Sequence, residues 1–152
     1  MISTLSDKEE VTETKKKIIF ENVHVLIAED NVINQKLILN VLNRLGVEVS
    51  MANNGLEALE LRMENEYDMI FMDVEMPVMG GMESTGKILS YERKNAKEHI
   101  PIVALTANAL SGDREKYIGA GMDAYLSKPI ELAALNDLLI DHFEERIVEG
   151  LG

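Results

Sequence analysis

The chain has 152 residues, of which 46% are hydrophobic and 28% charged, a composition typical of one globular domain with a real core. Its formal net charge is −12, which provides no counterion-release affinity and argues against direct binding to nucleic acid. The absence of cysteine excludes disulfides, thiolate metal sites and cysteine nucleophiles. Because no apolar run approaches a membrane span and no signal-peptide pattern opens the chain, we expect a cytoplasmic protein without membrane insertion.

The two ends of the chain differ from its middle. Residues 1–20 are polar and mixed in charge, so we expect a flexible N-terminal tail or the end of a linker. The charged run Glu144–Glu149 is expected to be the solvated end of a helix, followed by a C-terminal tail over residues 149–152. This leaves a single domain over residues 21–148.

Short apolar runs alternate with helical patterns from residue 23 onward. Val23–Ala28 predicts a strand, and apolar residues near helical spacing then continue up to Gly46, a helix-ending glycine. The positions on that helix expected to face the core are Ile33, Leu37, Val41, Leu42 and Leu45. Val47–Ala52 alternates with a period of two residues, as an edge strand does, and Asn54 opens a second helix.

The second half of the chain continues this alternation. Asp68–Asp73 is nearly all apolar, which indicates a strand buried on both faces. The next predicted elements are a helix over Glu83–Asn95, a strand over Pro101–Thr106, a helix from Asn108 to Ala120 and a strand over Ala124–Ser127. A last helix follows Pro129, and its apolar side carries Leu132, Leu135, Leu138, Leu139 and Phe143.

Five successive strand–helix units predict an α/β fold. Such alternation gives a parallel, doubly wound sheet with helices on both faces and right-handed crossovers. Ligands of open sheets of this type bind beyond the carboxyl ends of the strands. Functional side chains should therefore stand directly after the strands.

Four of the five predicted strands end in groups suited to phosphoryl chemistry. Glu29 and Asp30 follow the first strand, Asp73 ends the third, Thr106 ends the fourth and Lys128 follows the fifth. Taken singly, the acidic residues and the threonine could be helix caps or turn residues, and the lysine could be solvated. Their convergence on one sheet edge favours a shared site.

The chemistry of such a site follows from its charges. Three neighbouring carboxylates repel one another and raise a pKa unless a cation compensates them. Mg²⁺ prefers oxygen ligands, keeps several waters and neutralises phosphoryl oxygens during transfer. Lys128 could pair with a second phosphoryl oxygen, and Thr106 could donate a hydrogen bond to a third.

Five segments share their order and spacing with a known family. They read IAEDNVINQK (27–36), NNGLEALE (53–60), YDMIFMDVEMPVMGG (67–81), PIVALTANAL (101–110) and GDREKYIGAGMDAYLSKPI (112–130). These segments resemble the receiver domains of bacterial two-component response regulators, most like those attached to hybrid histidine kinases. The resemblance covers about residues 23–142 and implies a flavodoxin-like (βα)5 fold with strand order 2-1-3-4-5.

For the site, the resemblance implies that Asp73 is the phosphoacceptor. It implies a Mg²⁺ ion bound directly by Asp30 and Asp73, through water by Glu29, and by the backbone carbonyl of Glu75. The implied partners are a histidine kinase or histidine phosphotransfer domain, together with a weak homodimer on phosphorylation.

The resemblance also implies how the signal is made. Thr106 and Lys128 assist the phosphoryl group, Thr106 and Tyr125 form the switch pair, and the Lys128–Pro129 peptide bond is cis. The implied function is a phosphoacceptor switch in a phosphorelay, which changes the surface formed by the last two helices and the fifth strand. Such a domain catalyses its own phosphorylation and slow dephosphorylation but is not a turnover enzyme.

One loop departs from the family pattern. Receivers of this type often read MP-x-M-D-G, whereas this chain reads Met76-Pro77-Val78-Met79-Gly80-Gly81. Two adjacent glycines should loosen the loop.

Two other classes of function would leave different patterns in the sequence. A haloacid-dehalogenase-like phosphohydrolase would carry its nucleophile after the first strand in a D-x-D pattern, whereas Asp73 follows the third strand and Glu75 stands two residues on. A pseudo-receiver that only binds a partner would lack one of the acidic pair, the aspartate, the threonine or the lysine, and all are present. The three histidines, His24, His99 and His142, are scattered and form no ligand set.

Overall fold

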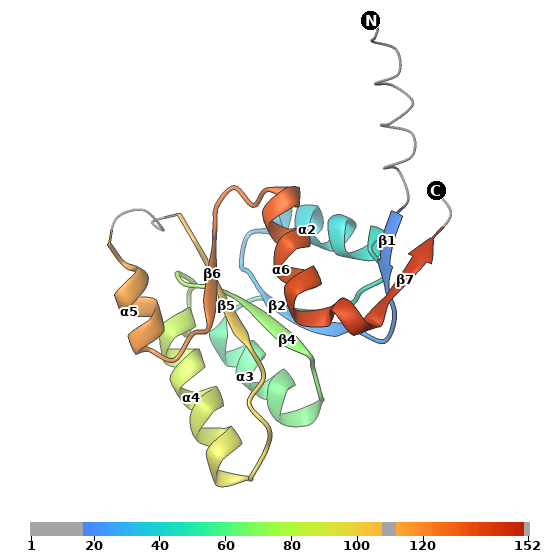
Figure 1. Ribbon diagram of the computed structural model, residues 1–152. Coiled ribbons are helices and arrows are strands. Elements are labelled where there is room, and N and C mark those ends of the chain that lie inside the picture. The colour runs from blue at the N-terminus through green and yellow to red at the C-terminus, as the bar shows by residue number, and fades with distance from the viewer. Residues whose placement is uncertain (1–16, 108–111, 151–152) are drawn as a thin grey trace, which may run out of the picture.

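The computed structural model describes residues 17–107 and 112–150. Its central sheet contains five parallel strands: β2 (His24–Ala28), β3 (Glu48–Ala52), β4 (Met69–Asp73), β5 (Ile102–Thr106) and β6 (Ala124–Ser127). They lie in the order β3-β2-β4-β5-β6 (Figure 1). Counted along these five strands alone, this is the predicted order 2-1-3-4-5, so the flavodoxin-like doubly wound fold is confirmed.

Helices cover both faces of the sheet. One face carries α2 (Val32–Arg44) and α6 (Leu132–Phe143), and the other carries α3 (Gly55–Glu64), α4 (Gly81–Lys94) and α5 (Arg114–Gly119) (Figure 1). The period of two along each strand divides the core accordingly. In β4, Phe71 packs in the cluster under α2 and α6, whereas Ile70 packs in the cluster under α3, α4 and α5.

Local signals set several helix boundaries, of which the start at Asn54 and the end at Gly46 were predicted from the sequence. The Asn31 side chain accepts a hydrogen bond of 2.9 Å from the Asn34 N–H and caps α2, and Asn54 caps α3 in the same way through the Glu57 N–H. Such caps are worth about 1 kcal/mol each. Beyond the end of α2, Gly46 has a φ of 80°, which glycine adopts without steric cost.

The helix predicted from Asn108 to Ala120 is shorter in the structure. Residues 108–111 lie outside the described part of the chain, and α5 begins only at Arg114. Gly112 has a φ of 86°, in the left-handed region, so a continuous helix cannot pass through this residue. The prediction was therefore wrong for residues 112 and 113.

The predicted ends of the domain are also corrected. Strand β1 (Lys17–Phe20) pairs antiparallel with β7 (Ile147–Gly150), after a short 3-10 helix over Glu144–Arg146 (Figure 1). Residues 17–20 are thus part of the fold rather than tail, and the second half of the run expected as a helix end, from Ile147 onward, is strand. Phe20 is 2% exposed in the core under α2 and α6. Each strand finds its hydrogen-bond partner at the opposite end of the chain, which no local pattern reveals.

Two elements leave apolar side chains outside the core. On α2, Ile33 is 75% and Leu37 is 56% exposed, and on α6 Leu132 is 55% exposed. All three were expected to face the core. Instead α2 rests on the sheet through Ile38 and Leu42, because its apolar stripe is wider than the contact. Within residues 17–107 and 112–150, no helix is long and apolar enough to span a membrane.

Candidate functional site

The predicted residues meet at the carboxyl edge of the sheet. Glu29 and Asp30 directly follow β2, Asp73 is the last residue of β4, and Thr106 is the last residue of β5. Lys128 follows β6. Because β2, β4, β5 and β6 are neighbours and parallel, their ends place these side chains around one point.

Lys128 joins two of the acidic side chains. Its Nζ lies 2.9 Å from Asp73 Oδ2 and 3.1 Å from Glu29 Oε1. The remaining carboxylate oxygens are held by backbone donors, since the Glu75 N–H donates to Asp73 Oδ1 over 3.2 Å and the Asn31 N–H donates to Glu29 Oε2 over 3.0 Å. The two carboxylates are therefore oriented by the fold itself.

Burial shifts the pKa of the proposed phosphoacceptor. Burial is the largest cause and raises the pKa of Asp73, Lys128 opposes it, and the charge of Glu29 adds to it, so that the pKa reaches about 6. For Lys128, burial lowers the pKa, but the hydrogen bonds and charges of Asp73 and Glu29 together raise it above its usual value. Lys128 is thus a cation at neutral pH, and Asp73 is mostly ionised there.

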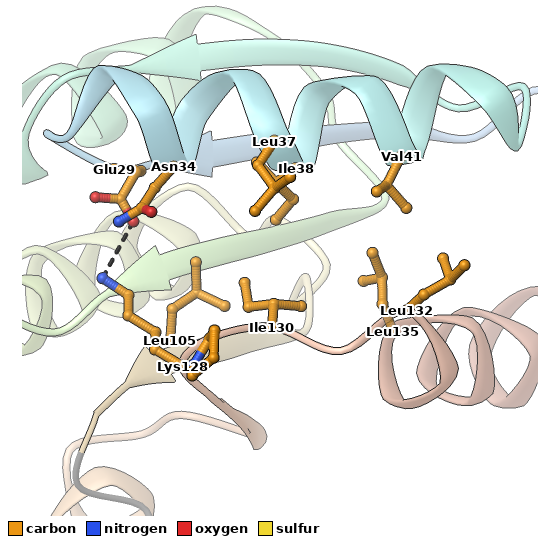
Figure 2. A pocket seen from close by; sticks show the side chains of 11 residues that line it. Glu29, Asn34, Leu37, Ile38, Val41, Leu105, Lys128, Ile130, Leu132 and Leu135 are labelled. Carbon is orange, nitrogen blue, oxygen red and sulfur yellow. Dashed lines mark ion pairs between the residues drawn. The ribbon is translucent and has the colours of Figure 1, made fainter.

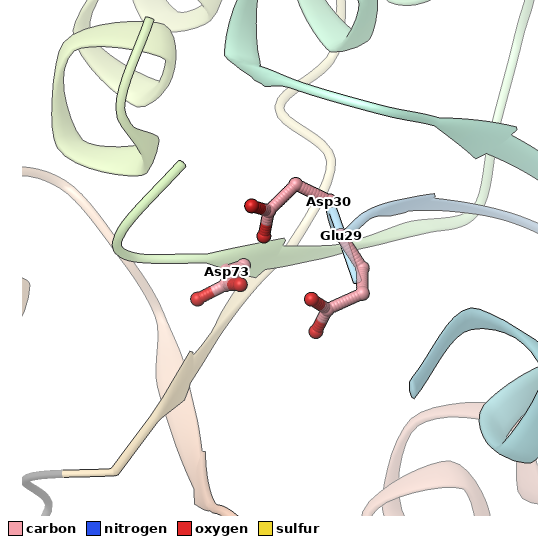
Figure 3. A group of neighbouring side chains, drawn as sticks. All are labelled: Glu29, Asp30 and Asp73. Carbon is pink, nitrogen blue, oxygen red and sulfur yellow. The ribbon is translucent and has the colours of Figure 1, made fainter. Parts of the chain in front are cut away.

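Glu29, Asp30 and Asp73 form a cluster suited to a hard cation. One carboxylate oxygen from each lies within 4.8 Å of the others, with Glu29 and Asp73 buried and Asp30 exposed (Figure 3). Three carboxylates face a single ammonium, so negative charge is in excess. A divalent cation with oxygen preference would remove this excess, so these residues fit Mg²⁺.

A cavity opens beside Asp73. It has a volume of about 280 Å³, and its lining includes Asp73, Glu75, Thr106, Tyr117 and Lys128. The space is bordered by a carboxylate, a cation and hydroxyl groups. This is the chemistry required to hold the oxygens of a phosphoryl group.

Tyr117 of α5 is a site residue that the sequence did not reveal. Its hydroxyl lies 2.7 Å from Thr106 Oγ1, and both residues are 3% exposed. The predicted switch partner, Tyr125, is half-buried against the α3, α4 and α5 cluster, with the Arg114 guanidinium 5.2 Å from its ring centre. Tyr117 could not be placed beforehand, because the register of α5 depends on the turn at Gly112. The Lys128–Pro129 bond is cis.

Backbone hydrogen bonds anchor the glycine-containing loop after β4. The Gly81 N–H donates to the Val74 carbonyl, and the Gly55 N–H donates to the Met79 carbonyl, each over 2.9 Å. A side chain at Gly81 would collide with the backbone of Asp73. The small residue at Gly81 serves close packing beside the site, and the looseness expected of the loop stays a prediction.

A second cleft lies between α2 and α6. Its volume is about 310 Å³, and apolar side chains that include Ile38, Val41, Ile130 and Leu135 line it (Figure 2). Glu29 and Lys128 border the same cleft, so an apolar surface leads directly to the charged site. The exposed Leu37 and Leu132 belong to its lining.

A buried ionic network lies away from the site. Glu92, 3% exposed, accepts from the buried Arg62 guanidinium at 3.3 Å. His99 Nδ1 lies 2.9 Å from Glu92 Oε1, and its Nε2 lies 2.9 Å from Asp123 Oδ2. These contacts give His99 a structural role, and no histidine stands in the acidic cluster among the described residues.

Comparison with known proteins agrees with this geometry. The family model for the response regulator receiver domain matches residues 25–140. The chain is 42% identical over 120 residues to hybrid signal transduction histidine kinase I of Dictyostelium discoideum, which covers 76% of this chain but 7% of that protein. It is 40% identical over 108 residues to the polar-differentiation response regulator DivK of Brucella anthropi, covering 71% of this chain and 85% of that one.

Solved structures give the same result. The chain is similar, with a TM-score of 0.79 and 33% identity, to a co-crystal structure of the Saccharomyces cerevisiae histidine phosphotransfer protein Ypd1 and the receiver domain of Ssk1. That match covers 86% of this chain and 94% of the other. The receiver domain of Pseudomonas aeruginosa sensor kinase PA1611, with a magnesium ion in its active-site cleft, matches with a TM-score of 0.71 and 38% identity over 82% and 99% of the two chains. The chain described here belongs to the response regulator receiver domain family of two-component signalling.

Proposed function

We propose that this receiver domain accepts a phosphoryl group from a phosphohistidine donor onto Asp73, in a Mg²⁺-dependent reaction. The observation that carries the proposal is the position of the Asp73 carboxylate. It ends a central strand, borders an open cavity, pairs with Lys128 at 2.9 Å and lies within 4.8 Å of the Glu29 and Asp30 oxygens.

The reaction is a transfer between two nucleophiles. An oxygen of the ionised Asp73 carboxylate forms a bond to phosphorus, and the bond from phosphorus to the donor imidazole nitrogen breaks. The electron pair of that bond stays on the imidazole, which takes up a proton. Lys128 already contacts Asp73 and can follow the new phosphoryl oxygens, while the buried edge of the sheet limits access of water.

The metal would be held by the acidic cluster. Asp30 and Asp73 would bind Mg²⁺ directly, Glu29 would bind it through water, and the Glu75 carbonyl would complete the protein ligands. When bound, the ion neutralises charge on the phosphoryl oxygens. The excess of negative charge around Lys128 supports this assignment.

We expect the signal to leave the site through the residues at the ends of β5 and β6. A phosphoryl group on Asp73 would offer the Thr106 hydroxyl a charged acceptor, and a shift of Thr106 would allow the Tyr125 ring to turn inward. The surface of α5, α6 and β6 would then change. A charge-assisted hydrogen bond of about 1.5–3 kcal/mol is enough to change the ratio of two states about ten- to a hundredfold.

The partner is proposed to dock over the apolar cleft between α2 and α6. A donor histidine must reach Asp73, and the exposed Leu37 and Leu132 line the cleft that leads to the charged site. Exposed apolar surface of this kind is typical of a protein interface. A histidine phosphotransfer domain or histidine kinase fits this role, and the related Ssk1 receiver crystallised with such a protein. A weak homodimer on phosphorylation remains a prediction, to be tested by sedimentation with and without beryllofluoride.

A labelling experiment tests the proposal. With Mg²⁺, a small acyl phosphate or a phosphohistidine donor should add one phosphoryl group to the unmutated chain and none to Asp73→Asn. Asp137→Asn, on the exposed side of α6, is the matched control and should label normally. Repeated turnover of a small phosphomonoester would instead favour a phosphohydrolase, and full labelling of Asp73→Asn would contradict the proposal.

A further inference from the structure

We propose that Tyr117 restrains Thr106 in the unphosphorylated state, and that the switch operates by breaking the Thr106–Tyr117 hydrogen bond. This inference rests on the proposed function, because it names the contact that phosphorylation of Asp73 must overcome. It makes Tyr117 a positioning residue for the switch and α5 the first helix to respond.

The contact is well formed, and both of its residues are buried. Thr106 Oγ1 and the Tyr117 hydroxyl are 2.7 Å apart, the usual distance of an O–H···O bond. Both residues are 3% exposed, so water does not readily replace either partner. A buried hydroxyl that loses its partner carries a desolvation penalty, which makes this bond a real restraint.

Tyr117 is held in place by its packing and by its backbone hydrogen bonds. Its ring packs in the core cluster under α3, α4 and α5, together with Ile88 and Met122. Its backbone is held on both sides, since its N–H donates to the Asp113 carbonyl and its carbonyl accepts from the Met122 N–H, each over 3.1 Å. A displacement of the Thr106 hydroxyl toward Asp73 therefore lengthens the bond instead of carrying Tyr117 along.

Both residues of this hydrogen bond border the cavity beside Asp73. Tyr117 and Thr106 line the same cavity as Asp73 and Lys128. Whichever of the two hydroxyls donates in the unmodified state, a charged phosphoryl oxygen is a stronger acceptor for the Thr106 proton than a neutral phenol, and the Thr106 oxygen must move toward Asp73 to donate to it. Phosphorylation thus draws the Thr106 hydroxyl from Tyr117 toward Asp73.

The released phenol transmits the change to α5. After Thr106 moves, the Tyr117 hydroxyl is buried without its former partner, and this favours a shift of the helix that carries it. Tyr117 lies in the middle of the short helix Arg114–Gly119, so the whole helix is affected. Tyr125, on the neighbouring strand β6, can then respond to the same movement of Thr106.

The test is a titration with beryllofluoride, a phosphoryl mimic, in the presence of Mg²⁺. Tyr117→Phe keeps the ring and removes the hydroxyl, so the restraint on Thr106 is lost. The apparent affinity for beryllofluoride should therefore increase about two- to tenfold. Tyr91→Phe is the matched control, because that hydroxyl donates to the Met63 carbonyl at an exposed position. Its affinity should equal that of the unmutated chain.

A double-mutant cycle separates a restraint on Thr106 from a general structural effect. In the Thr106→Val background, Tyr117→Phe should leave the affinity unchanged. An unchanged or weaker affinity of the single variant Tyr117→Phe, or the same gain in the Thr106→Val background, would overturn the inference. A failure of the unmutated chain to bind beryllofluoride would instead contradict the proposed function, and this inference with it.

A second measurement needs no variant. The ¹³Cζ resonance of Tyr117 reports the hydrogen bonding of its phenol and should shift when beryllofluoride binds the unmutated chain. If that resonance stays in place while the amide of Thr106 shifts, the hydrogen bond survives the switch and the inference is wrong.

Discussion

Lys128 Nζ contacts Asp73 Oδ2 at 2.9 Å and also reaches Glu29 Oε1 at 3.1 Å. The lysine therefore compensates two buried carboxylates before any phosphoryl group or metal is bound. It serves the unmodified fold as well as the proposed chemistry, and this dual role can be measured.

Removing Lys128 should destabilise the metal-free protein in a pH-dependent way. Lys128→Ala leaves Asp73 and Glu29 without their cation, and at pH 7 we expect a loss of about 1–3 kcal/mol in unfolding free energy. The folded pKa of Asp73, already about 6, lies above its unfolded value, so protonation at low pH relieves the repulsion. The loss should therefore shrink at pH 5. Urea titrations at both pH values, with the exposed Lys87→Ala as control, check this. An equal loss at pH 5 and pH 7 would contradict it.

Mg²⁺ should stabilise the protein through the acidic cluster. An ion that binds only the folded site adds about 2.7 kcal/mol at a concentration one hundred times its Kd. Thermal melts with millimolar Mg²⁺ should show a higher midpoint for the unmutated chain and for Asp137→Asn. Asp30→Asn removes a proposed direct ligand, and its midpoint should not respond. A metal response that persists in Asp30→Asn would place the ion elsewhere.

His99 should make part of the stability depend on pH. Only the protonated imidazole can donate to Glu92 and Asp123 at once, and both contacts are 2.9 Å long. Partial burial lowers the pKa of His99, but the two carboxylates together raise it above its usual value. The stabilisation is therefore complete below the unfolded pKa and is lost as pH rises through the folded pKa.

A variant of His99 isolates the pH-dependent contribution of this residue to the free energy of unfolding. The difference in unfolding free energy between the unmutated chain and His99→Gln should be larger at pH 6 than at pH 8.5. Because the network lies away from the acidic cluster, beryllofluoride affinity at pH 7 should stay the same. A difference that is constant across this pH range would show that His99 is not held as a cation.

The apolar surface beside the site should affect the rate of phosphoryl transfer from a protein donor but not from a small-molecule donor. Leu37→Ser or Leu132→Ser should lower the rate of phosphoryl transfer from a histidine phosphotransfer domain about tenfold or more, since each removes a contact from the proposed interface. Labelling by a small acyl phosphate should be unaffected. Ile118→Ser is the control, because Ile118 is 57% exposed but lies on α5. An equal effect on both donors would indicate damage to the site rather than to docking.

The fold was predictable because its signals are local. A few residues are enough to identify the helix start at Asn54, the helix-ending glycine Gly46 and the buried apolar strand that ends at Asp73. The edge location of the site then followed from the parallel sheet alone, and the structure brings Glu29, Asp30, Asp73 and Lys128 together as expected.

What could not be predicted depends on contacts between distant segments. Strands β1 and β7 exist only through each other, and the orientation of α2 that exposes Ile33 is decided by how the helix rests on the sheet. The Thr106–Tyr117 bond is of the same kind, because it requires the tertiary position of a short helix. Periodicity identifies an apolar stripe but not which part of it is covered.

The central claim is that Asp73 carries the phosphoryl group, and one measurement tests it most directly. After labelling with a phosphohistidine donor and Mg²⁺, borohydride reduces an aspartyl phosphate to homoserine, which peptide mass spectrometry can locate. We predict homoserine at position 73 and at no other aspartate, including the neighbouring site residue Asp30. Homoserine at position 30, or labelling that resists borohydride and maps to a hydroxyl or a histidine, would contradict the account.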